Sequence, residues 1–178
     1  MGKPIVIQVT GYSNSGKTTL VSQWIKYLND KGLQVSVIKH HGHSGEPLVV
    51  GDEGKDSESF RRAGATDSLV VSDTEFHWIG GLAKKPSLST LISWVSDTDP
   101  DVILVEGFKM ERYPKIVLVR DWQDRLLIEE SSNVNVIVCW REEDRRFFQT
   151  KGYEAFMINN WLSEIDNVTG IFKVNGEV

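Results

Sequence analysis

The chain has 178 residues, of which 40% are hydrophobic and 25% are charged, so it is long enough for one buried core and short for two ordinary domains. We therefore expect a single domain over residues 1–178. Its one cysteine excludes a disulfide framework, and no apolar stretch reaches the length of a membrane span, so we expect a cytoplasmic protein. A net charge of -5 argues against a nucleic-acid binder.

The first predicted strand and the first predicted helix flank a glycine-rich segment. Residues 5–10 are β-branched and apolar, which predicts a buried parallel strand, and apolar residues at helical spacing follow over residues 20–28. The segment between them matches the pattern G-x-x-x-x-G-K-[ST] of a phosphate loop. We expect the following residues to bind a nucleoside triphosphate: Gly11, Tyr12, Ser13, Asn14, Ser15, Gly16, Lys17, Thr18 and Thr19.

Each fixed position of this pattern has a physical reason. Gly11 and Gly16 allow backbone torsions and a close approach that a Cβ atom would prevent, so that successive N–H groups point at an anion. Lys17 is expected to contact the β- and γ-phosphates, and the Thr18 hydroxyl is expected to bind Mg²⁺. The pattern identifies neither the base nor the reaction.

The second predicted strand leads into a histidine-rich segment. The first helix begins at Lys17, and residues 33–38 then form a second parallel strand. Because ligands of open α/β sheets bind beyond the carboxyl ends of strands, we expect Lys39, His40 and His43 to contact phosphate or substrate there. A transition-metal site and solvated loop residues are the alternatives.

A loop over residues 42–56 is expected to precede a short helix over residues 57–63. Asp56 lies at the start of this helix. Its carboxylate has two possible roles, because it could take part in catalysis by positioning water or supporting the metal, or it could cap the helix.

A β-hairpin is predicted over residues 67–81, with strand-like runs on either side of Asp73-Thr74. Its second strand carries Phe76, Trp78 and Ile79 with little room for a covering helix, so we expect these side chains to form a dimer interface. The alternative is a hairpin that packs on its own domain.

The rest of the chain continues the alternation of strands and helices. A helix is predicted over residues 88–95 and a final helix over residues 153–165, with strands over residues 101–107, 115–120 and 134–140. Strands separated by helical segments imply a P-loop α/β sandwich of three layers, in which a mostly parallel sheet has helices on both faces.

Glu106 ends a strand of four apolar residues, which is the form of a Walker B element. A carboxylate at this position, beside the phosphate loop, could order the Mg²⁺ ion and take part in catalysis together with Lys17. A surface carboxylate at the end of a strand is the alternative.

Three arginines follow the predicted strand over residues 134–140. Arg141, Arg145 and Arg146 could form a lid that neutralises a transferring phosphoryl group, as in a small-molecule kinase. Alternatively, they pair with the three acidic residues between them, over positions 142–144.

Four segments together resemble the molybdopterin-guanine dinucleotide biosynthesis protein B (MobB) family: GYSNSGKTT, KHHGH, GKDSESFRRAGA and ILVEGFK. The resemblance implies a homodimeric GTP-binding protein with weak GTPase activity and bound Mg²⁺. It would be an accessory to the guanylyltransferase that attaches GMP to molybdopterin. The resemblance supports guanine, whereas the residues alone do not separate GTP from ATP. A further alternative is an interaction protein that nucleotide merely stabilises.

Overall fold

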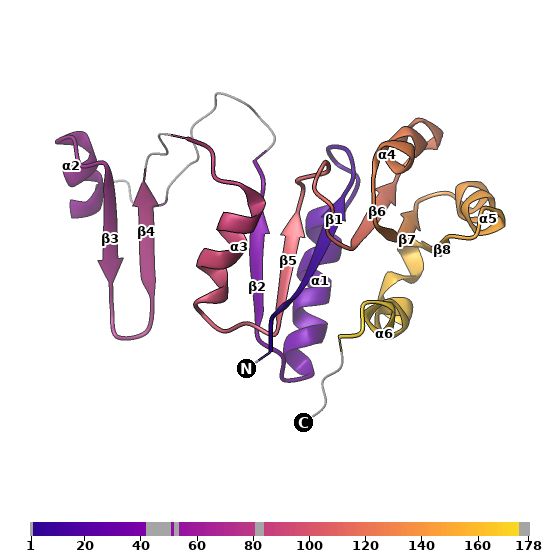
Figure 1. Cartoon of the computed structure of the whole chain (residues 1–178), viewed down its shortest axis with the longest axis horizontal. Coiled ribbons are helices and arrows are strands. Elements are labelled where there is room, and N and C mark those ends of the chain that lie inside the picture. The colour runs from indigo at the N-terminus through magenta and orange to yellow at the C-terminus, as the bar shows by residue number, and fades with distance from the viewer. Residues whose placement is uncertain (1, 42–50, 52–53, 81–83, 175–178) are drawn as a thin grey trace. The chain divides into compact units, whose positions relative to one another are not determined.

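The computed structural model describes residues 2–41, 51, 54–80 and 84–174, which form two compact units. One unit comprises Met1–Gly42 and Leu88–Val178, and the other comprises His43–Ser87. The strands, labelled in Figure 1, are β1 (Ile5–Thr10), β2 (Val35–Lys39), β3 (Asp67–Val71), β4 (Phe76–Gly80), β5 (Val102–Glu106), β6 (Lys115–Val119), β7 (Val134–Cys139) and β8 (Glu154–Met157). The α-helices are α1 (Lys17–Asp30), α2 (Asp56–Arg62), α3 (Leu88–Ser96), α4 (Arg125–Glu130), α5 (Glu142–Thr150) and α6 (Trp161–Ile171), and short 3-10 turns are η1 (Trp122–Asp124) and η2 (Ile158–Asn160).

The larger unit, which we call the sheet unit, is built on a six-stranded sheet in the order β2-β5-β1-β6-β7-β8. All of its strand pairs are parallel. Every residue of β5 and β6 is buried, which is expected of parallel strands that are covered on both faces. The predicted α/β sandwich with a mostly parallel sheet is therefore confirmed.

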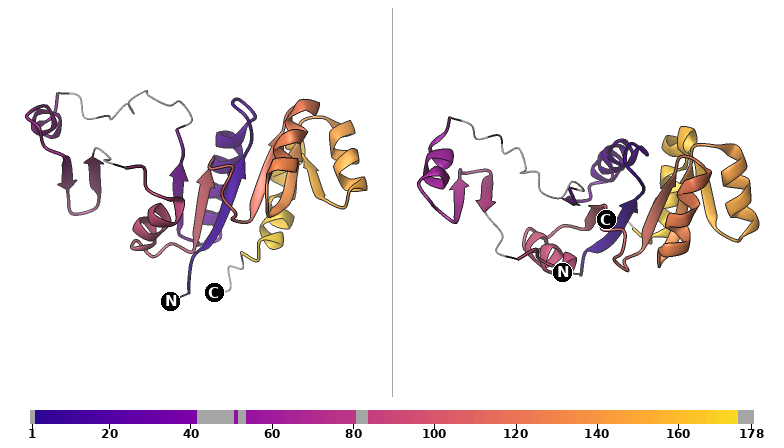
Figure 2. Two further views of the ribbon diagram at one scale, coloured as in Figure 1. Left: turned by 45° about the horizontal axis from the view of Figure 1, so that its top comes forward. Right: turned by 90° about the horizontal axis from the view of Figure 1, so that it is seen from above.

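Helices cover both faces of this sheet, as Figures 1 and 2 show. On one face, α1 and α6 pack over a core in which Trp24 and Trp161 meet edge to face at 5.7 Å, and the Trp24 Nε1–H donates to the Thr169 hydroxyl at 2.9 Å. On the other face, α4 and α5 cover β6 and β7, and α3 covers β2 and β5. Because both faces of the sheet are packed, the carboxyl ends of its strands are held in fixed positions. The candidate site lies at these ends.

Cys139, at the end of β7, has no exposed surface. Burial, helped by the neighbouring Asp144 carboxylate, raises the pKa of its thiol to about 12. The thiol therefore remains protonated at neutral pH, as expected of a buried and unreactive cysteine.

The smaller unit, which we call the hairpin unit, contains α2 and the antiparallel pair β3–β4. The Ser72 hydroxyl closes the turn, because it accepts hydrogen bonds from the N–H groups of Thr74 and Glu75 at 3.3 and 3.0 Å. The predicted hairpin is therefore confirmed. Cross-strand partners Leu69 and Trp78 lie on the same face of this ribbon.

Two predictions about local structure are wrong. The segment predicted as a helix over residues 153–165 contains β8, which pairs with β7 in the sheet, and α6 begins only at Trp161. Glu-Ala-Phe-Met favours a helix locally, but pairing with a buried neighbour overrides that propensity. The capping role for Asp56 is also wrong, because Asp56 lies inside α2 and no side chain caps that helix.

None of the helices in the described ranges is both long and apolar enough to cross a membrane. Helix α4 is not among the predicted elements, and it follows the 3-10 turn η1. Helix α5 follows β7 and carries two of the three arginines, Arg145 and Arg146.

Candidate nucleotide-binding site

The candidate site lies at the carboxyl end of β1, where connections leave toward opposite sides of the sheet. Strand β1 lies between β5 and β6. It connects through α1 to β2 on the β5 side, whereas β6 connects through α4 to β7 on the opposite side, so the connections from β1 and β6 diverge. In open α/β sheets this point leaves a crevice in which ligands bind. The loop of residues 11–16 leaves β1 at this crevice and leads into α1.

The backbone of this loop requires glycine at two positions. A Cβ atom on Gly11 would lie 2.6 Å from the Ser15 hydroxyl oxygen and 3.2 Å from the Leu118 carbonyl oxygen, so any larger residue would force the loop or these neighbours to shift. Gly16 has a φ of 95° and precedes the first residue of α1, and no side chain caps this helix. The first N–H groups of α1 therefore remain available to an anion, and the helix dipole favours negative charge there.

Lys17 provides a cation at this loop. Its ammonium donates to the Tyr12 carbonyl at 2.7 Å, so the side chain folds back over the loop. Burial lowers the pKa of Lys17, and the nearby Glu106 carboxylate opposes that shift. Among the described residues its direct hydrogen-bond partner is a neutral carbonyl, so this partly desolvated ammonium is well suited to bind phosphate.

Thr18, Lys39 and Glu106 meet beside Lys17. The Thr18 hydroxyl donates to the Glu106 carboxylate, with 3.1 Å to each oxygen, and the Lys39 ammonium lies 3.2 Å from both the Thr18 hydroxyl oxygen and the Glu106 Oε1 atom. The structure thus brings together residues that the sequence placed on three separate segments. A hydroxyl and a carboxylate are hard oxygen donors of the kind Mg²⁺ prefers, so these residues fit that ion.

Strand β5 ends at Glu106, and polar groups hold the loop that follows. The buried Gln8 amide donates to the carbonyls of Gly107 and Phe108 at 3.1 and 2.9 Å. The fully buried Lys115 ammonium donates to the carbonyls of Lys109 and Glu111 at 3.3 and 2.5 Å. These contacts fix the loop from inside and so fix the position of the carboxylate.

His40 lies against this loop. Its ring centroid is 4.9 Å from that of Phe108, and its backbone N–H donates to the Glu106 carbonyl at 2.9 Å. A Cβ atom on Gly107 would lie 3.0 Å from the His40 Cβ atom, so glycine allows the close approach. His40 therefore lies at the predicted edge of the site.

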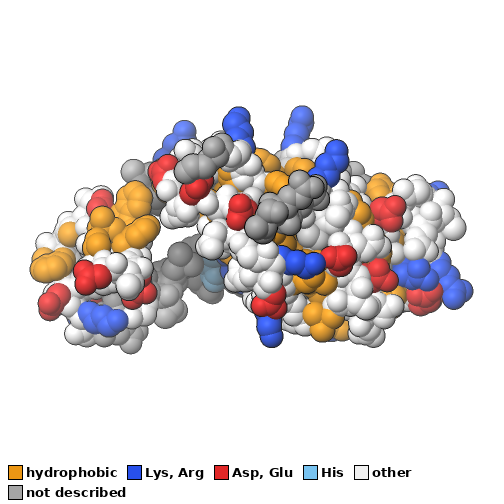
Figure 3. Space-filling view, turned by 90° about the horizontal axis from the view of Figure 1, so that it is seen from below, with side chains coloured by type: hydrophobic (Ala, Val, Ile, Leu, Met, Phe, Trp, Pro, Cys, Tyr) orange, Lys and Arg blue, Asp and Glu red, His pale blue; other side chains and the backbone are white. Residues whose placement is uncertain are grey.

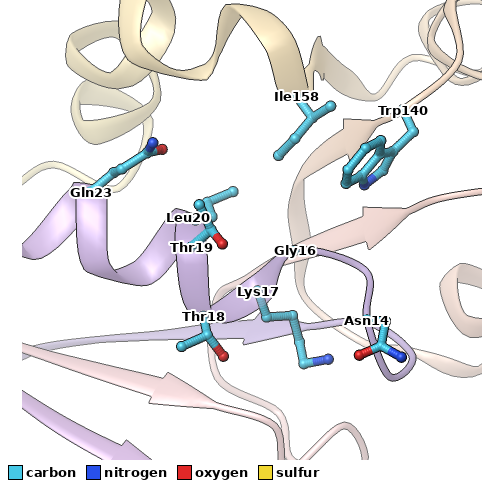
Figure 4. A pocket seen from close by; sticks show the side chains of 9 residues that line it. All are labelled: Asn14, Gly16, Lys17, Thr18, Thr19, Leu20, Gln23, Trp140 and Ile158. Carbon is cyan, nitrogen blue, oxygen red and sulfur yellow. The ribbon is translucent and has the colours of Figure 1, made fainter.

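A cavity of about 470 Å³ opens on the loop and extends beyond it. Figure 4 shows the side chains of Trp140 and Ile158 above the start of α1, with Leu20 and Gln23 on the helix itself. The residues that line the cavity are Asn14, Gly16, Lys17, Thr18, Thr19, Leu20, Gln23, Trp140 and Ile158.

Sequence reasoning missed Trp140, Ile158 and Arg120 as parts of this region. The Trp140 Nε1–H donates to the Ser15 carbonyl at 2.9 Å, and the Arg120 guanidinium donates to the Asn14 carbonyl at 3.2 Å. Trp140 and Arg120 both follow strands of the sheet, β7 and β6, at the edge that carries the loop. In the sequence, the position of Trp140 and Arg120 after two predicted strands indicates that they lie at this edge of the sheet.

The other predicted residues add no contact to this group within the described part of the sheet unit. His43 lies outside the described residues, and Asp56 belongs to the hairpin unit. The three arginines are paired: Arg141 with Glu143 and Asp144, and both Arg145 and Arg146 with Glu142. The alternative interpretation of these arginines as paired surface residues therefore describes their contacts.

The described residues contain no group of three or more His, Cys, Asp or Glu side chains placed to hold a metal ion. Thr18 and Glu106 would instead contribute to a site that a bound ligand completes, as in nucleotide-dependent Mg²⁺ binding.

The sheet order, the phosphate loop and the Thr18–Glu106 contact define a P-loop protein of the α/β class. The model of the family described as molybdopterin guanine dinucleotide synthesis protein B (MobB) matches residues 6–140. The chain belongs to this family.

Relatives of known name agree with this assignment. A molybdopterin-guanine dinucleotide biosynthesis adapter protein of Haemophilus influenzae is 39% identical over 161 residues, covering 88% of this chain and 89% of the relative. A probable adapter protein of the same name in Bacillus subtilis is 31% identical over 151 residues, covering 85% and 84%.

Solved structures agree on the fold. The crystal structure of Bacillus subtilis MobB superimposes with a TM-score of 0.74 at 27% identity, covering 93% of this chain and 96% of that one. A MobB homologue from Bacillus stearothermophilus gives a TM-score of 0.72 at 23% identity, covering 96% and 99%.

Proposed function

We propose that the chain is a cytoplasmic GTP-binding adapter in molybdopterin guanine dinucleotide synthesis, with slow GTP hydrolysis at most. Membership of the MobB family supports the pathway, because relatives that align over most of the chain carry that name. The observation that carries the nucleotide site is the contact of the Thr18 hydroxyl with both Glu106 carboxylate oxygens, beside Lys17.

In this proposal each part of the site has one task. The uncapped start of α1 and Lys17 hold the triphosphate, while Thr18 and Glu106 hold Mg²⁺. Lys39 and His40 line the phosphate edge. Glu106 orients water for the slow hydrolysis. The ion's contribution is to neutralise charge on the phosphates.

Equilibrium binding of GTP and ATP with Mg²⁺ tests this site. Lys17→Ala should weaken GTP binding about tenfold to 100-fold, because it removes a charged hydrogen-bond donor. Lys26→Ala is a matched control, since Lys26 is an exposed lysine of the same helix. Unchanged GTP affinity in Lys17→Ala would show that the site is misassigned, and equal affinities for GTP and ATP in the wild type would remove the guanine part of the proposal.

Turnover distinguishes an adapter from a kinase. We expect slow hydrolysis that the guanylyltransferase, with or without molybdopterin, accelerates. Sustained phosphorylation of a pterin or nucleoside at about 1 to 100 per second would contradict the adapter proposal. Pairing of Arg145 and Arg146 with Glu142 weakens the case for a kinase lid, because these guanidinium groups already have a carboxylate partner.

We also propose a homodimer formed through the hairpin. Figure 3 shows hydrophobic side chains gathered on the hairpin unit. One face of the ribbon carries two cross-strand pairs of exposed large apolar residues, Leu69 with Trp78 and Val71 with Phe76. Ile79 lies on the opposite face and is half-buried. Aromatic side chains that lose water on contact dominate interface energies, so a second copy would gain most from Phe76 and Trp78.

A further inference from the structure

The cavity beside the phosphate loop has an apolar side that the phosphates of a nucleotide do not explain. Its polar side consists of the loop and the start of α1, including Lys17 and Thr18. Away from these groups, Trp140 and Ile158 line it from the ends of two neighbouring strands, as Figure 4 shows. A ligand that fills both sides must carry phosphate at one end and an apolar surface at the other.

Trp140 is held firmly although much of it remains exposed. Its Nε1–H donates to the Ser15 carbonyl at 2.9 Å, and its ring lies 3.4 Å from the position that a Cβ atom on Gly16 would take. The Arg120 guanidinium lies 5.7 Å from its ring centroid. With 42% of its surface exposed, the indole is oriented by the loop and still offers surface to the cavity.

A planar aromatic ring is the ligand group that matches such a surface. Bases stack on tryptophan with a gain that does not depend on their hydrogen-bonding pattern, because every base has a π-face. An indole fixed before binding loses little side-chain entropy when a base stacks on it. The aliphatic side chain of Ile158 supplies a second apolar contact on the same cavity.

We infer that Trp140 is the stacking platform for the base of the nucleotide bound at the phosphate loop, with Ile158 completing the apolar base site. This inference rests on the proposed nucleotide binding. It assigns the base to the end of β7 and the turn after β8. Because the indole is hydrogen-bonded to Ser15, the same side chain connects the base to the loop that holds the phosphates.

Binding of GTP and of inorganic tripolyphosphate, both with Mg²⁺, separates the base site from the phosphate site. Calorimetry on the full chain compares the wild type with Trp140→Leu, Trp140→Phe and Trp122→Leu. Trp122→Leu is the matched control, since Trp122 is also partly exposed but meets Phe147 edge to face, with ring centroids 4.8 Å apart, and does not line the cavity.

Trp140→Leu should weaken GTP binding roughly tenfold or more and change tripolyphosphate binding less than about twofold. Trp140→Phe should keep most of the GTP affinity, because phenylalanine retains a ring for stacking while losing the hydrogen bond to Ser15. Trp122→Leu should leave both affinities unchanged.

Other results would overturn the inference. If Trp140→Leu weakens both ligands equally, Trp140 only positions the loop. If the wild type binds tripolyphosphate as tightly as GTP, and that binding depends on Lys17, the phosphate site stands and the base site fails. If the wild type binds neither ligand, the proposed nucleotide binding itself fails.

Tryptophan fluorescence gives a readout that a purely structural role would not change. The chain has six tryptophans, so each variant is compared with the wild type. GTP should quench the wild type more than tripolyphosphate does, and Trp140→Phe should lose that difference. Equal quenching by GTP in the wild type and in Trp140→Phe would contradict base stacking on Trp140.

Discussion

Apolar residues of the strands are buried in the sheet unit but largely exposed in the hairpin unit. Every residue of β5 and β6 is buried between two helical layers, whereas β3 and β4 expose Leu69, Val71, Phe76 and Trp78 on one face. The sheet unit uses its apolar side chains to fix the ends of its strands, where the charged groups of the site meet. The hairpin unit leaves these apolar side chains exposed. We propose that ligand binding belongs to the sheet unit and association to the hairpin unit.

The largest expected effect concerns stability, and it tests the contrast between the buried sheet and the exposed hairpin. Leu104→Ala, in the fully buried strand β5, should lower the free energy of unfolding of the sheet by about 2–5 kcal/mol, because it leaves a cavity in the core. Leu69→Ala is the same substitution at an exposed position of the hairpin and should cost less than about 0.5 kcal/mol. Urea titrations followed by circular dichroism measure both.

Equal costs for the two leucine variants would remove the distinction between the units. A cost of Leu69→Ala that grows with protein concentration would instead indicate that a second copy covers this side chain.

The next effect concerns association. Phe76→Asp combined with Trp78→Asp should weaken the dimer by about 2 kcal/mol or more, which is roughly 30-fold, because charged groups replace the two aromatic side chains at the centre of the exposed face. Nucleotide affinity should stay within about twofold. Sedimentation velocity over a range of concentrations measures the dimer, and a double variant as dimeric as the wild type would exclude this face.

A smaller effect is expected from the carboxylate of the site. Glu106→Gln keeps the shape of the side chain but removes its charge, so it should lower the Mg²⁺-dependent part of GTP affinity about tenfold. GTP binding measured in EDTA, which removes Mg²⁺, should differ little between Glu106→Gln and the wild type. Glu154→Gln, at the exposed start of β8, is the control. A loss of the same size in EDTA would mean that Glu106 supports the fold and not the ion.

The smallest effect concerns the hairpin turn. Ser72→Ala removes the acceptor of the Thr74 and Glu75 N–H groups and should destabilise the hairpin locally by about 1 kcal/mol. Hydrogen exchange at the amides of β3 and β4 should become roughly fivefold faster, while amides of β1 and β5 serve as internal controls. Unchanged exchange would show that the turn forms without this hydroxyl.

Local sequence signals predicted most of the sheet unit and also the hairpin. The phosphate loop, the strand ending at Glu106 and the hairpin each carry their pattern within about ten consecutive residues, so they could be recognised without knowledge of contacts. Lys39 could be placed near the loop because carboxyl ends of parallel strands lie at one edge.

Features that depend on distant contacts could not be predicted in the same way. Strand β8 exists because it pairs with β7, although its own residues favour a helix. Trp140 is drawn to the phosphate loop by a hydrogen bond to a residue 125 positions earlier in the sequence. No local pattern contains that partner, and the same holds for the contact of Arg120 with Asn14.

The buried contacts of Gln8 and Lys115 have a practical consequence for the loop after Glu106. They hold its backbone from beneath, so its outer side chains are not needed to keep its shape. Met110 is 72% exposed on this loop, close in sequence to the carboxylate. A fluorescent label at this position would therefore report on events beside the site while leaving the loop's internal anchors intact.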